Sequence, residues 1–458
     1  MFRTVAAAVL LAAGSAKAEL YADTTFGNAG FVDVAISDVP YFQRPTVLVQ
    51  PDHRVVVAVV PEPTVQTPPL QMRIVRLLPD GSRDTAFGAN GIAALPLTSQ
   101  PVQYGYVTDL QRQADGRLLV MVWMSRPGTP PAPGGTPVDI LEQLLLRLND
   151  DGSPDATFNA GQPVVLSSGT QSLALKLLPP QADGGLLLVF TNGNERFRAR
   201  RLRADGSADT AFGSGGELIV TQPGSISSDV MSLPGGGLQV LHRSAYGSPP
   251  RNFWRRYRGD GSLDTAFGNG GEQELILTES LPMESVGALG DGTVLGWRGS
   301  CPMRLFDAEG RVLSYLATCP DLLYTGGFRP QRYGEKLLFS GIINGFSATS
   351  APDGGPTGLF LHVTDRRGVL DRGFTASVDG RWRPPDQSSA PYMAAADGGD
   401  RIVLVRPDDN GLRVWRYRDL RGSDPLSRPV PALNPAASAL LLAMLAIVGL
   451  FAVRRRAA

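Results

Sequence analysis

A short apolar run that follows a polar turn recurs along the chain. In residues 182–190, ADGGLLLVF, a turn of Asp and Gly leads into five apolar residues. Asp-Gly favours the positive φ of a tight hairpin turn, and a strand that is apolar on both faces is typical of one buried between two layers. The copies are 51–60, 114–123, 182–190, 234–241, 290–297, 333–341 and 397–405. The pattern therefore predicts one buried strand in each of seven units.

A second motif alternates with the first and gives the same count. It reads RLRADGSADTAFGSGG at 201–216 and RYRGDGSLDTAFGNGG at 256–271. Further copies lie at 22–30, 80–91 and 151–161, worn copies at 308–317 and 366–376, and a half-copy ends at Asp424. Self-similarity at such a period is the signature of repeat architectures. We expect units at about 24–84, 85–155, 156–209, 210–264, 265–314, 315–371 and 372–424.

Each clear copy carries an aspartate and, three residues later, a phenylalanine. The aspartate is expected to accept backbone N–H bonds and fix the turn, and the phenylalanine to fill the junction between units. A catalytic role is the alternative, but residues repeated in every unit serve the identical joints that a repeat architecture needs. These residues are Asp84, Phe87, Asp155, Phe158, Asp209, Phe212, Asp264 and Phe267. The arginine strands before them (Arg76, Arg147, Arg201 and Arg256) indicate a more exposed strand.

About four short strands per unit with Gly-rich turns predict an all-β fold, a seven-bladed β-propeller over residues 19–424, with a β-solenoid as the alternative. Residues 31–36 are expected to complete the ring beside a final strand at 412–418. We expect the Asp-Gly turns to join the second strand of a unit to the third. The DTAFG segments are expected to join the fourth strand to the next unit.

The remaining connections, expected between the third and fourth strands, vary in length and lie on the opposite face of the ring. They are 61–69, 125–139, 191–196, 244–250 and 343–358. Binding residues concentrate on variable loops that a rigid scaffold presents, so this face is expected to contact a partner. Insertions without any role are the alternative, because long loops cost little stability.

The combined pattern, R-L-x-x-D-G-S-x-D-T-x-F-G-x-x-G followed by x-x-D-G-x-L-L-V, resembles the delta-60 repeat of exported bacterial proteins. The resemblance covers about residues 23–424, although Asn159 replaces glycine in the third copy. It implies a propeller-like array outside the cytoplasm, and it implies no reaction.

Residues 1–18 are typical of a secretory signal peptide. Arg3 precedes an apolar run at 5–14 that is too short to cross a bilayer, and Ala16 and Ala18 suit cleavage after Ala18. An uncleaved N-terminal anchor is the alternative. The sequence therefore predicts export.

The other end predicts an anchor. A proline-rich linker at 425–435 leads into an apolar stretch at 436–453, long enough for a transmembrane helix. Arg454, Arg455 and Arg456 lie in a tail, 454–458, that is expected to stay cytoplasmic. A buried core helix is the alternative. The bulk of the chain is then expected on the periplasmic side of the inner membrane.

Val430, Pro431, Ala432 and Leu433 stand before this apolar stretch. Together with the helix and the arginines they resemble the IPTL-CTERM and PEP-CTERM sorting signals of exported Gram-negative proteins, with a match at two of the four IPTL positions. The resemblance implies an exosortase-like protease as a partner that removes the helix and releases the chain to the cell surface or beyond. Retention as an anchor is the alternative.

Composition limits the chemistry. The chain has 43 basic and 43 acidic residues, so it lacks the basic excess expected of a nucleic-acid binder. The three histidines (His53, His242 and His362) have no metal-ligand spacing, G-x-S-x-G is absent, and no metal or cofactor is expected. Export permits a disulfide between Cys301 and Cys319, with two free thiols as the alternative.

Two functions remain open. The first is a displayed, non-catalytic propeller that binds a protein or polysaccharide as yet unknown. The second is a propeller enzyme, carbohydrate-active or lyase-like, with a pair of carboxyl groups in the central funnel. Two acids with strongly shifted pKa values near the axis would favour the enzyme.

Overall fold

The fold was analysed in a computed structural model. The residues that it describes are 20–36, 45–61, 70–98, 102–128, 138–170, 174–191, 197–220, 225–233, 236–244, 251–275, 285–288, 294–297, 304–307, 311–315, 329–343, 358–365, 371, 374, 393–408 and 411–419. Within these ranges the chain is built from β-strands, with a single 3-10 turn at Asn159–Gly161. The all-β prediction is confirmed.

The described strands form seven antiparallel sheets, which we number in chain order. Sheet 1 holds β3 (Thr46–Val49), β4 (Val55–Val59), β5 (Leu70–Leu77) and β6 (Ile92–Thr98). Sheet 2 holds β7 (Tyr104–Arg112), β8 (Leu118–Arg126), β9 (Ile140–Leu148) and β10 (Val164–Gly169). Sheet 3 holds β11 (Ala174–Leu177), β12 (Leu186–Thr191), β13 (Phe197–Leu202) and β14 (Glu217–Ile219).

Sheet 4 holds β15 (Ser225–Ser232), β16 (Leu238–Ser244), β17 (Asn252–Tyr257) and β18 (Glu272–Leu275). Sheet 5 holds β19 (Ser285–Ala288), β20 (Val294–Trp297), β21 (Arg304–Phe306) and β22 (Val312–Tyr315). Sheet 6 holds β23 (Arg329–Tyr333), β24 (Lys336–Ile343) and β25 (Gly358–Thr364). Sheet 7 holds β26 (Met393–Asp397), β27 (Arg401–Asp408) and β28 (Gly411–Asp419), together with β1 (Leu20–Ala22) and β2 (Phe31–Ala35).

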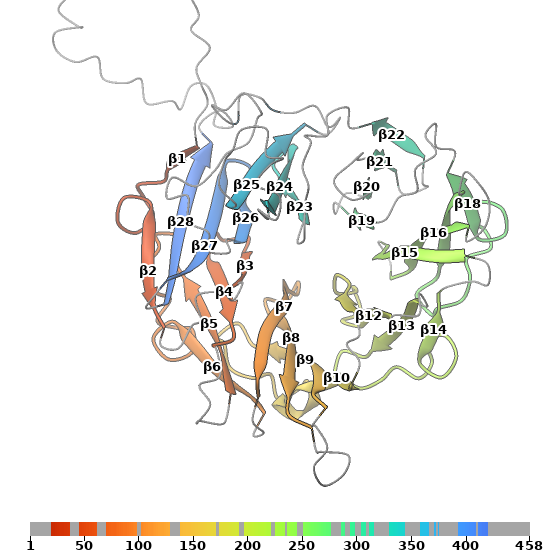
Figure 1. Ribbon diagram of the computed structural model, residues 1–458, viewed down its shortest axis with the longest axis horizontal. Coiled ribbons are helices and arrows are strands. Elements are labelled where there is room, and N and C mark those ends of the chain that lie inside the picture. The colour runs from red at the N-terminus through yellow and green to blue at the C-terminus, as the bar shows by residue number, and fades with distance from the viewer. Residues whose placement is uncertain are drawn as a thin grey trace, which may run out of the picture.

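The sheets follow one another around a ring (Figure 1). In each four-stranded sheet the strands pair in chain order, so every strand is hydrogen-bonded to its neighbour in the sequence. The first strands, such as β3 and β15, lie nearest the middle of the ring, and the last strands, such as β6 and β18, lie at its outside. Short connections dictate this order, because antiparallel neighbours need only a hairpin turn.

Sheet 7 joins the two ends of the folded chain. Strand β28 pairs with β27 along one edge and with β2 and β1 along the other. The register places Val34 opposite Leu412 and Phe31 opposite Trp415. The prediction that residues 31–36 complete the sheet of the final strand is confirmed, since Phe31–Ala35 pairs with β28 along the edge opposite β27.

The prediction for the order of the connections is wrong by one strand. The DTAFG segment at 84–88 lies between β5 and β6, which are the third and fourth strands of one sheet. A tight turn, closed by the bridge from Ala89 to Ile92, returns the chain to its own sheet. The Asp-Gly turn at 115–116 joins the first strand of sheet 2 to the second. The predicted unit boundaries at residues 84, 155, 209 and 264 therefore fall inside sheets.

The prediction that the Asp-Gly turns and the DTAFG segments lie on one face of the ring does not depend on this shift. Connections after the first and third strands of an up-and-down sheet lie at one end, and those after the second lie at the other. The Asp-Gly turns and DTAFG segments thus share one face, which we call the turn face. The second strands end at the opposite face, and the variable connections, as at 61–69, follow them in the sequence; most residues of these connections lie outside the described ranges.

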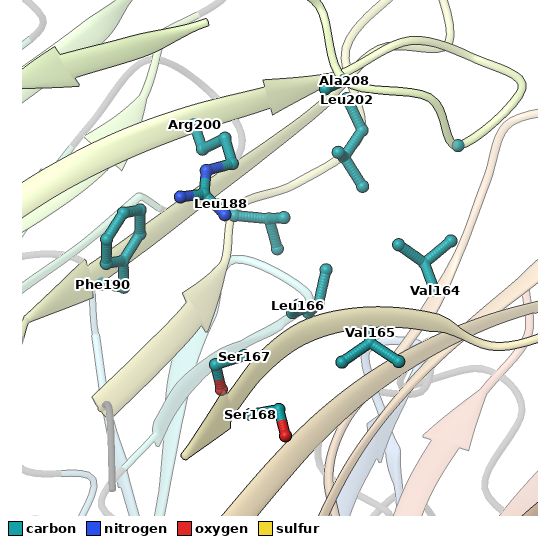
Figure 2. Close-up of a pocket in the computed structure, with 11 residues that line it drawn as sticks. Val164, Val165, Leu166, Ser167, Ser168, Leu188, Phe190, Arg200, Leu202 and Ala208 are labelled. Carbon is teal, nitrogen blue, oxygen red and sulfur yellow. The ribbon is translucent and has the colours of Figure 1, made fainter. Parts of the chain in front are cut away.

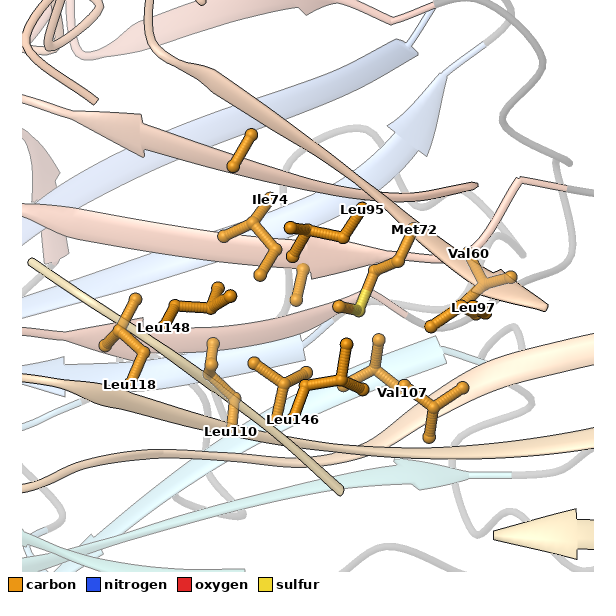
Figure 3. Packing of buried hydrophobic residues seen from close by; sticks show 14 of the residues in the cluster. Val60, Met72, Ile74, Leu95, Leu97, Val107, Leu110, Leu118, Leu146 and Leu148 are labelled. Carbon is orange, nitrogen blue, oxygen red and sulfur yellow. The ribbon is translucent and has the colours of Figure 1, made fainter. Parts of the chain in front are cut away.

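The core lies between neighbouring sheets. All five residues of β4 are buried: Val56 and Ala58 pack toward sheet 2, while Val55, Val57 and Val59 pack toward sheet 7. Figure 3 shows the first of these layers, in which Met72 and Ile74 of β5 meet Leu118 and Leu146 of sheet 2. Because the second strand of a sheet, such as β4, has a neighbouring sheet on each side, both of its faces are apolar, as the sequence pattern predicts.

Several predictions fall outside the described residues. These are the signal peptide and its cleavage site at Ala18, the sorting motif at 430–433, the transmembrane helix at 436–453, the arginine tail, and both Cys301 and Cys319. Among the residues that are described, none belongs to a helix long and apolar enough to cross a membrane.

Candidate functional site

The repeated aspartates lie at the joints between sheets. In the joint after sheet 2, the Nε of Arg147 donates to Oδ2 of Asp155 over 2.6 Å, and its Nη1 donates to the carbonyl of Ala204 in sheet 3 over 2.5 Å. The other carboxylate oxygen accepts bonds from the main chain and hydroxyl of Thr157. One arginine thus fixes the DTAFG turn and ties it to the next sheet.

The same joint recurs with small changes. Arg76 binds Asp84 over 2.8 Å and the carbonyl of Asp150 across the joint. Arg201 binds Asp209 over 3.3 Å. At Asp264 the pattern changes, because Arg256 donates to Gln239 and the exposed Arg258 pairs with Asp264.

These arginines correct the sequence analysis, which placed them on a more exposed strand. Arg76 and Arg147 are buried, and each guanidinium lies over the ring of the phenylalanine in its own motif, at 4.5 and 4.6 Å from the centroid. Their signal in the sequence is the constant spacing of eight residues before each aspartate, as in Arg76 and Asp84. The sequence shows this spacing, but it does not show that the arginine also donates a hydrogen bond to the next sheet.

The repeated phenylalanines fill the joints. Phe87, Phe158, Phe212 and Phe267 are all buried. A methyl group placed on Gly152 of the next turn would lie 2.8 Å from the ring of Phe87, and one on Gly206 would lie 3.0 Å from Phe158. Only glycine therefore lets the next turn approach the ring.

A main-chain bond accompanies each of these contacts. The N–H of Gly88 donates to the carbonyl of Asp151, and that of Gly213 to the carbonyl of Asp260. Asn159, which replaces glycine in the third copy, makes the equivalent bond to Asp205 and adopts a φ of 48°. Asparagine tolerates that left-handed conformation better than most residues, so the substitution preserves the joint.

The joint between sheets 7 and 1 has an additional hydrogen bond on the turn face. Nδ1 of His53 lies 2.6 Å from Oδ1 of Asp397, whose side chain is fully buried. His53 has a φ of 67° at a turn position where sheets 2 and 3 have Gly116 and Gly184. At the position of Asp397, sheet 1 has Gln50.

Several described carboxyl groups are held in their ionised form by the groups around them. Burial alone would raise the pKa of Asp155, but hydrogen bonds from Thr157 and Arg147 outweigh it and lower the pKa below the ordinary value. In Asp23, burial likewise acts to raise the pKa, but the hydrogen bonds from Thr25 and the charge of Arg416 outweigh it and lower the pKa. Wherever a described acid shows a clear pKa shift, the shift is downward. A general acid at neutral pH requires the opposite, so the carboxyl groups with a lowered pKa are not prepared for that role.

The histidines do not form a metal site among the described residues. His53 pairs with Asp397, and buried His242 lies 3.3 Å from Glu272 in sheet 4. Burial lowers the pKa of His242 and so favours its neutral form. His362 lies on β25 in sheet 6.

A cavity of about 350 Å³ lies between sheets 2 and 3, and the sequence analysis did not predict it. One wall is the outer strand β10, with Val164, Leu166 and Ser167; the other has Leu188 and Phe190 of β12 and Arg200 and Leu202 of β13 (Figure 2). The gap between two sheets depends on their relative orientation, which a repeat pattern does not reveal. We call this space the interblade cavity.

Arg200 is the one ionisable residue that lines the interblade cavity. Its guanidinium lies 5.0 Å from the ring centroid of Phe190, and its Nη2 donates to Glu217 over 3.0 Å. Arg198, two residues earlier, donates to the other oxygen of Glu217 over 2.7 Å. The two arginines lower the pKa of Glu217 against the effect of its burial. The cavity therefore combines aliphatic walls with one cation.

The comparisons with known proteins agree with this architecture. The sequence model of a family described as "Domain of unknown function (DUF5122) beta-propeller" matches residues 50–87 and 181–212. Each matched segment begins at the turn between the first and second strands of a sheet and ends at the phenylalanine of a DTAFG motif. This chain is a β-propeller repeat protein. The matched segments include Asp84, Phe87, Asp209 and Phe212, so the family pattern contains the joint residues.

The solved structures that match the chain do so at low similarity. A protein of unknown function from Dyadobacter fermentans is 15% identical, with 73% of this chain and 98% of that chain covered and a TM-score of 0.38. The WD40 β-propeller domain of Doa1 is 10% identical (84% and 94% covered, TM-score 0.39). BBS1N in its complex with ARL6DN is 12% identical (87% and 98%, TM-score 0.41). No curated protein matches the chain. These similarities indicate no ligand and no reaction for the propeller.

Proposed function

We propose that the chain is an exported, non-catalytic β-propeller that is displayed on the cell envelope as a binding scaffold. The observation that carries this proposal is the use of the described acids: they pair with arginines or fix turns, and the clear pKa shifts are all downward. A ring whose charged side chains hold identical joints together is a rigid scaffold. Its binding residues then lie between or beyond the joints.

In this proposal the seven sheets are the blades of one ring built from delta-60-like repeats. Residues 1–18 direct export, 425–435 link the propeller to the membrane helix at 436–453, and the arginine tail stays in the cytoplasm. An exosortase-like protease recognises Val430–Leu433 and releases the propeller. Cys301 and Cys319 form a disulfide once outside. The enzyme alternative has no supporting observation among the described residues.

Mass spectrometry of the protein recovered from envelope and culture fractions of a Gram-negative host tests the proposal. We expect a mature N-terminus at residue 19, the loss of residues after about 435, and a Cys301–Cys319 bridge. A chain recovered whole from the cytoplasm would contradict export. Release of sugar products from a panel of polysaccharides by the purified chain would contradict the non-catalytic role.

A further inference from the structure

The interblade cavity has the chemistry of a site for an apolar group next to an anion. Its walls are aliphatic, from Val164, Leu166, Leu188 and Leu202, and Arg200 supplies its one positive charge. At about 350 Å³ it is at the lower end of the roughly 300–1,000 Å³ range of ligand sites. That size suits one or two side chains better than a cofactor. A carboxylate complements the guanidinium.

Arg200 retains the capacity to bind such a carboxylate. A guanidinium has five N–H donors, and the bond to Glu217 uses one of them. The side chain of Arg200 is 42% exposed, so an incoming group can reach it. Arg198 shares Glu217 with Arg200, which gives this triad one positive charge in excess. A ligand carboxylate would therefore add to the existing ion pairs without displacing Glu217.

The strand beside the cavity is the second observation. β10 is the last strand of sheet 2, so alternate main-chain N–H and C=O groups face away from β9. Such edges are normally protected by charges, by proline or by shortness. β2 carries Asp33, β6 carries Pro96, and β14 and β18 carry glutamates. β10 carries neither charge nor proline over its six residues, a property that it shares with β22 and β25, the outermost described strands of sheets 5 and 6.

β10 also presents apolar side chains where pairing would occur. Val165 is 57% exposed. A bulge between Val165 and Ser167 interrupts the register with β9, and it brings Val164 and Leu166 together against the buried residues of the joint. An exposed valine on an uncharged edge strand is typical of a surface that pairs with another extended chain.

We propose that the interblade cavity, with β10 as its rim, binds an extended peptide segment of a partner protein. This inference rests on the proposed role as a binding scaffold and names its partner class. An aliphatic side chain of the peptide enters between Leu166 and Leu188, and a neighbouring carboxylate, from Asp, Glu or a chain terminus, pairs with Arg200. The main chain of the peptide runs along β10.

A library of random dodecapeptides displayed on phage, selected on the full-length chain, provides the probe. Peptides enriched on the wild type are expected to carry an aliphatic residue within two positions of an acid. One enriched peptide is then synthesised, and its Kd is measured by fluorescence anisotropy. Arg200→Ala is expected to weaken binding about tenfold or more, because a charge-assisted hydrogen bond is lost. The matched control Arg198→Ala, which loses the same partner outside the cavity, is expected to change Kd less than about twofold.

Ser167→Trp, which fills the cavity from its rim, gives a second variant that leaves the ion pairs intact and is expected to abolish binding. No enrichment, enrichment without acids, or equal loss in Arg198→Ala and Arg200→Ala would overturn the inference. Binding of a glycan array through Arg200, or pairing of two copies of the chain at β10, would also overturn it. If export is observed and no peptide binds, this inference alone fails. If the chain stays in the cytoplasm, the proposed function fails whatever the peptide does.

Discussion

Arg416 and Asp23 lie 393 positions apart in the sequence, and Nε of Arg416 donates to Oδ2 of Asp23 over 2.8 Å. Both side chains are buried, and Nη1 of Arg416 reaches the carbonyl of Pro79 in sheet 1. The guanidinium lies 4.7 Å from the ring centroid of Phe26. The joint that closes the ring is therefore chemically the same as the joints within it, although its two halves come from opposite ends of the chain.

Arg416→Ala should destabilise the closing joint. It leaves the carboxylate of Asp23 buried without its main partner, a change that typically costs about 3–5 kcal/mol. Arg413→Ala is the matched control, since Arg413 lies on the same strand and pairs with exposed Asp33; it should cost at most about 1 kcal/mol. Urea unfolding followed by tryptophan fluorescence measures both. Equal losses in the two variants would contradict the role given to Arg416.

His53 and Asp397 should show coupling in a double-mutant cycle. His53→Gly relieves a left-handed backbone worth about 1–2 kcal/mol but removes a bond to a buried carboxylate worth about 1.5–3 kcal/mol. The net expectation is a destabilisation of about 1 kcal/mol. The double variant His53→Gly with Asp397→Gln reproduces the residues of the next joint, Gln50 and Gly116, and should recover most of that loss. A stabilising His53→Gly variant would show that the hydrogen bond to Asp397 contributes nothing.

Gly152 should be less replaceable than Gly215. Both have a positive φ, of 83° and 64°, so alanine strains each backbone by about 1–2 kcal/mol. A methyl group on Gly152 also meets the ring of Phe87, while one on Gly215 has nothing within 4 Å. Overpacking adds about 1–3 kcal/mol to Gly152→Ala alone. Thermal unfolding of the two variants compares them, and similar melting temperatures would argue against the packing of Phe87 in the joint.

The stability of the propeller should fall in acid. The pKa values of Asp23 and Asp155 are lower in the folded chain than their ordinary value of 3.8. The unfolded chain then binds protons first, so this stabilisation is complete above about pH 5 and is lost as the pH falls below 4 toward the folded pKa values. Urea midpoints between pH 7 and pH 3 test this. Asp155→Asn should be less stable at pH 7 and should lose less on acidification; an unchanged slope would contradict the assignment.

The sequence predicts the repeated parts of this fold well. The apolar run at 186–190 and the DTAFG motifs identify strands and turns because hairpins and buried strands depend on local residue types. The pairing of residues 31–36 with the final strand can also be predicted from the sequence, because the incomplete copies at the two ends of the repeat can together form one sheet. The signal peptide, the sorting motif, the membrane helix and the disulfide stay predictions.

The sequence does not predict what depends on the angle between sheets. Arg76 and Arg147 could not be recognised as buried, because the second partner of each, such as Ala204 for Arg147, comes from a segment more than fifty residues away. The predicted position of the DTAFG turn is wrong by one strand, because the residues of this turn are the same whether it follows the last strand of a sheet or lies between two strands of it. The interblade cavity was missed for the same reason, since Leu166 and Leu188 meet only in the assembled ring.

The shared sheet has a consequence for the order of events during synthesis. Residues 20–35 emerge first, but their hydrogen-bonding edge, β28, emerges after nearly four hundred further residues have been made. Contacts at such sequence separation form late and slowly. The leading segment must therefore stay unpaired until the last strand has been made, and any chaperone or protease that binds the nascent chain encounters it in that state.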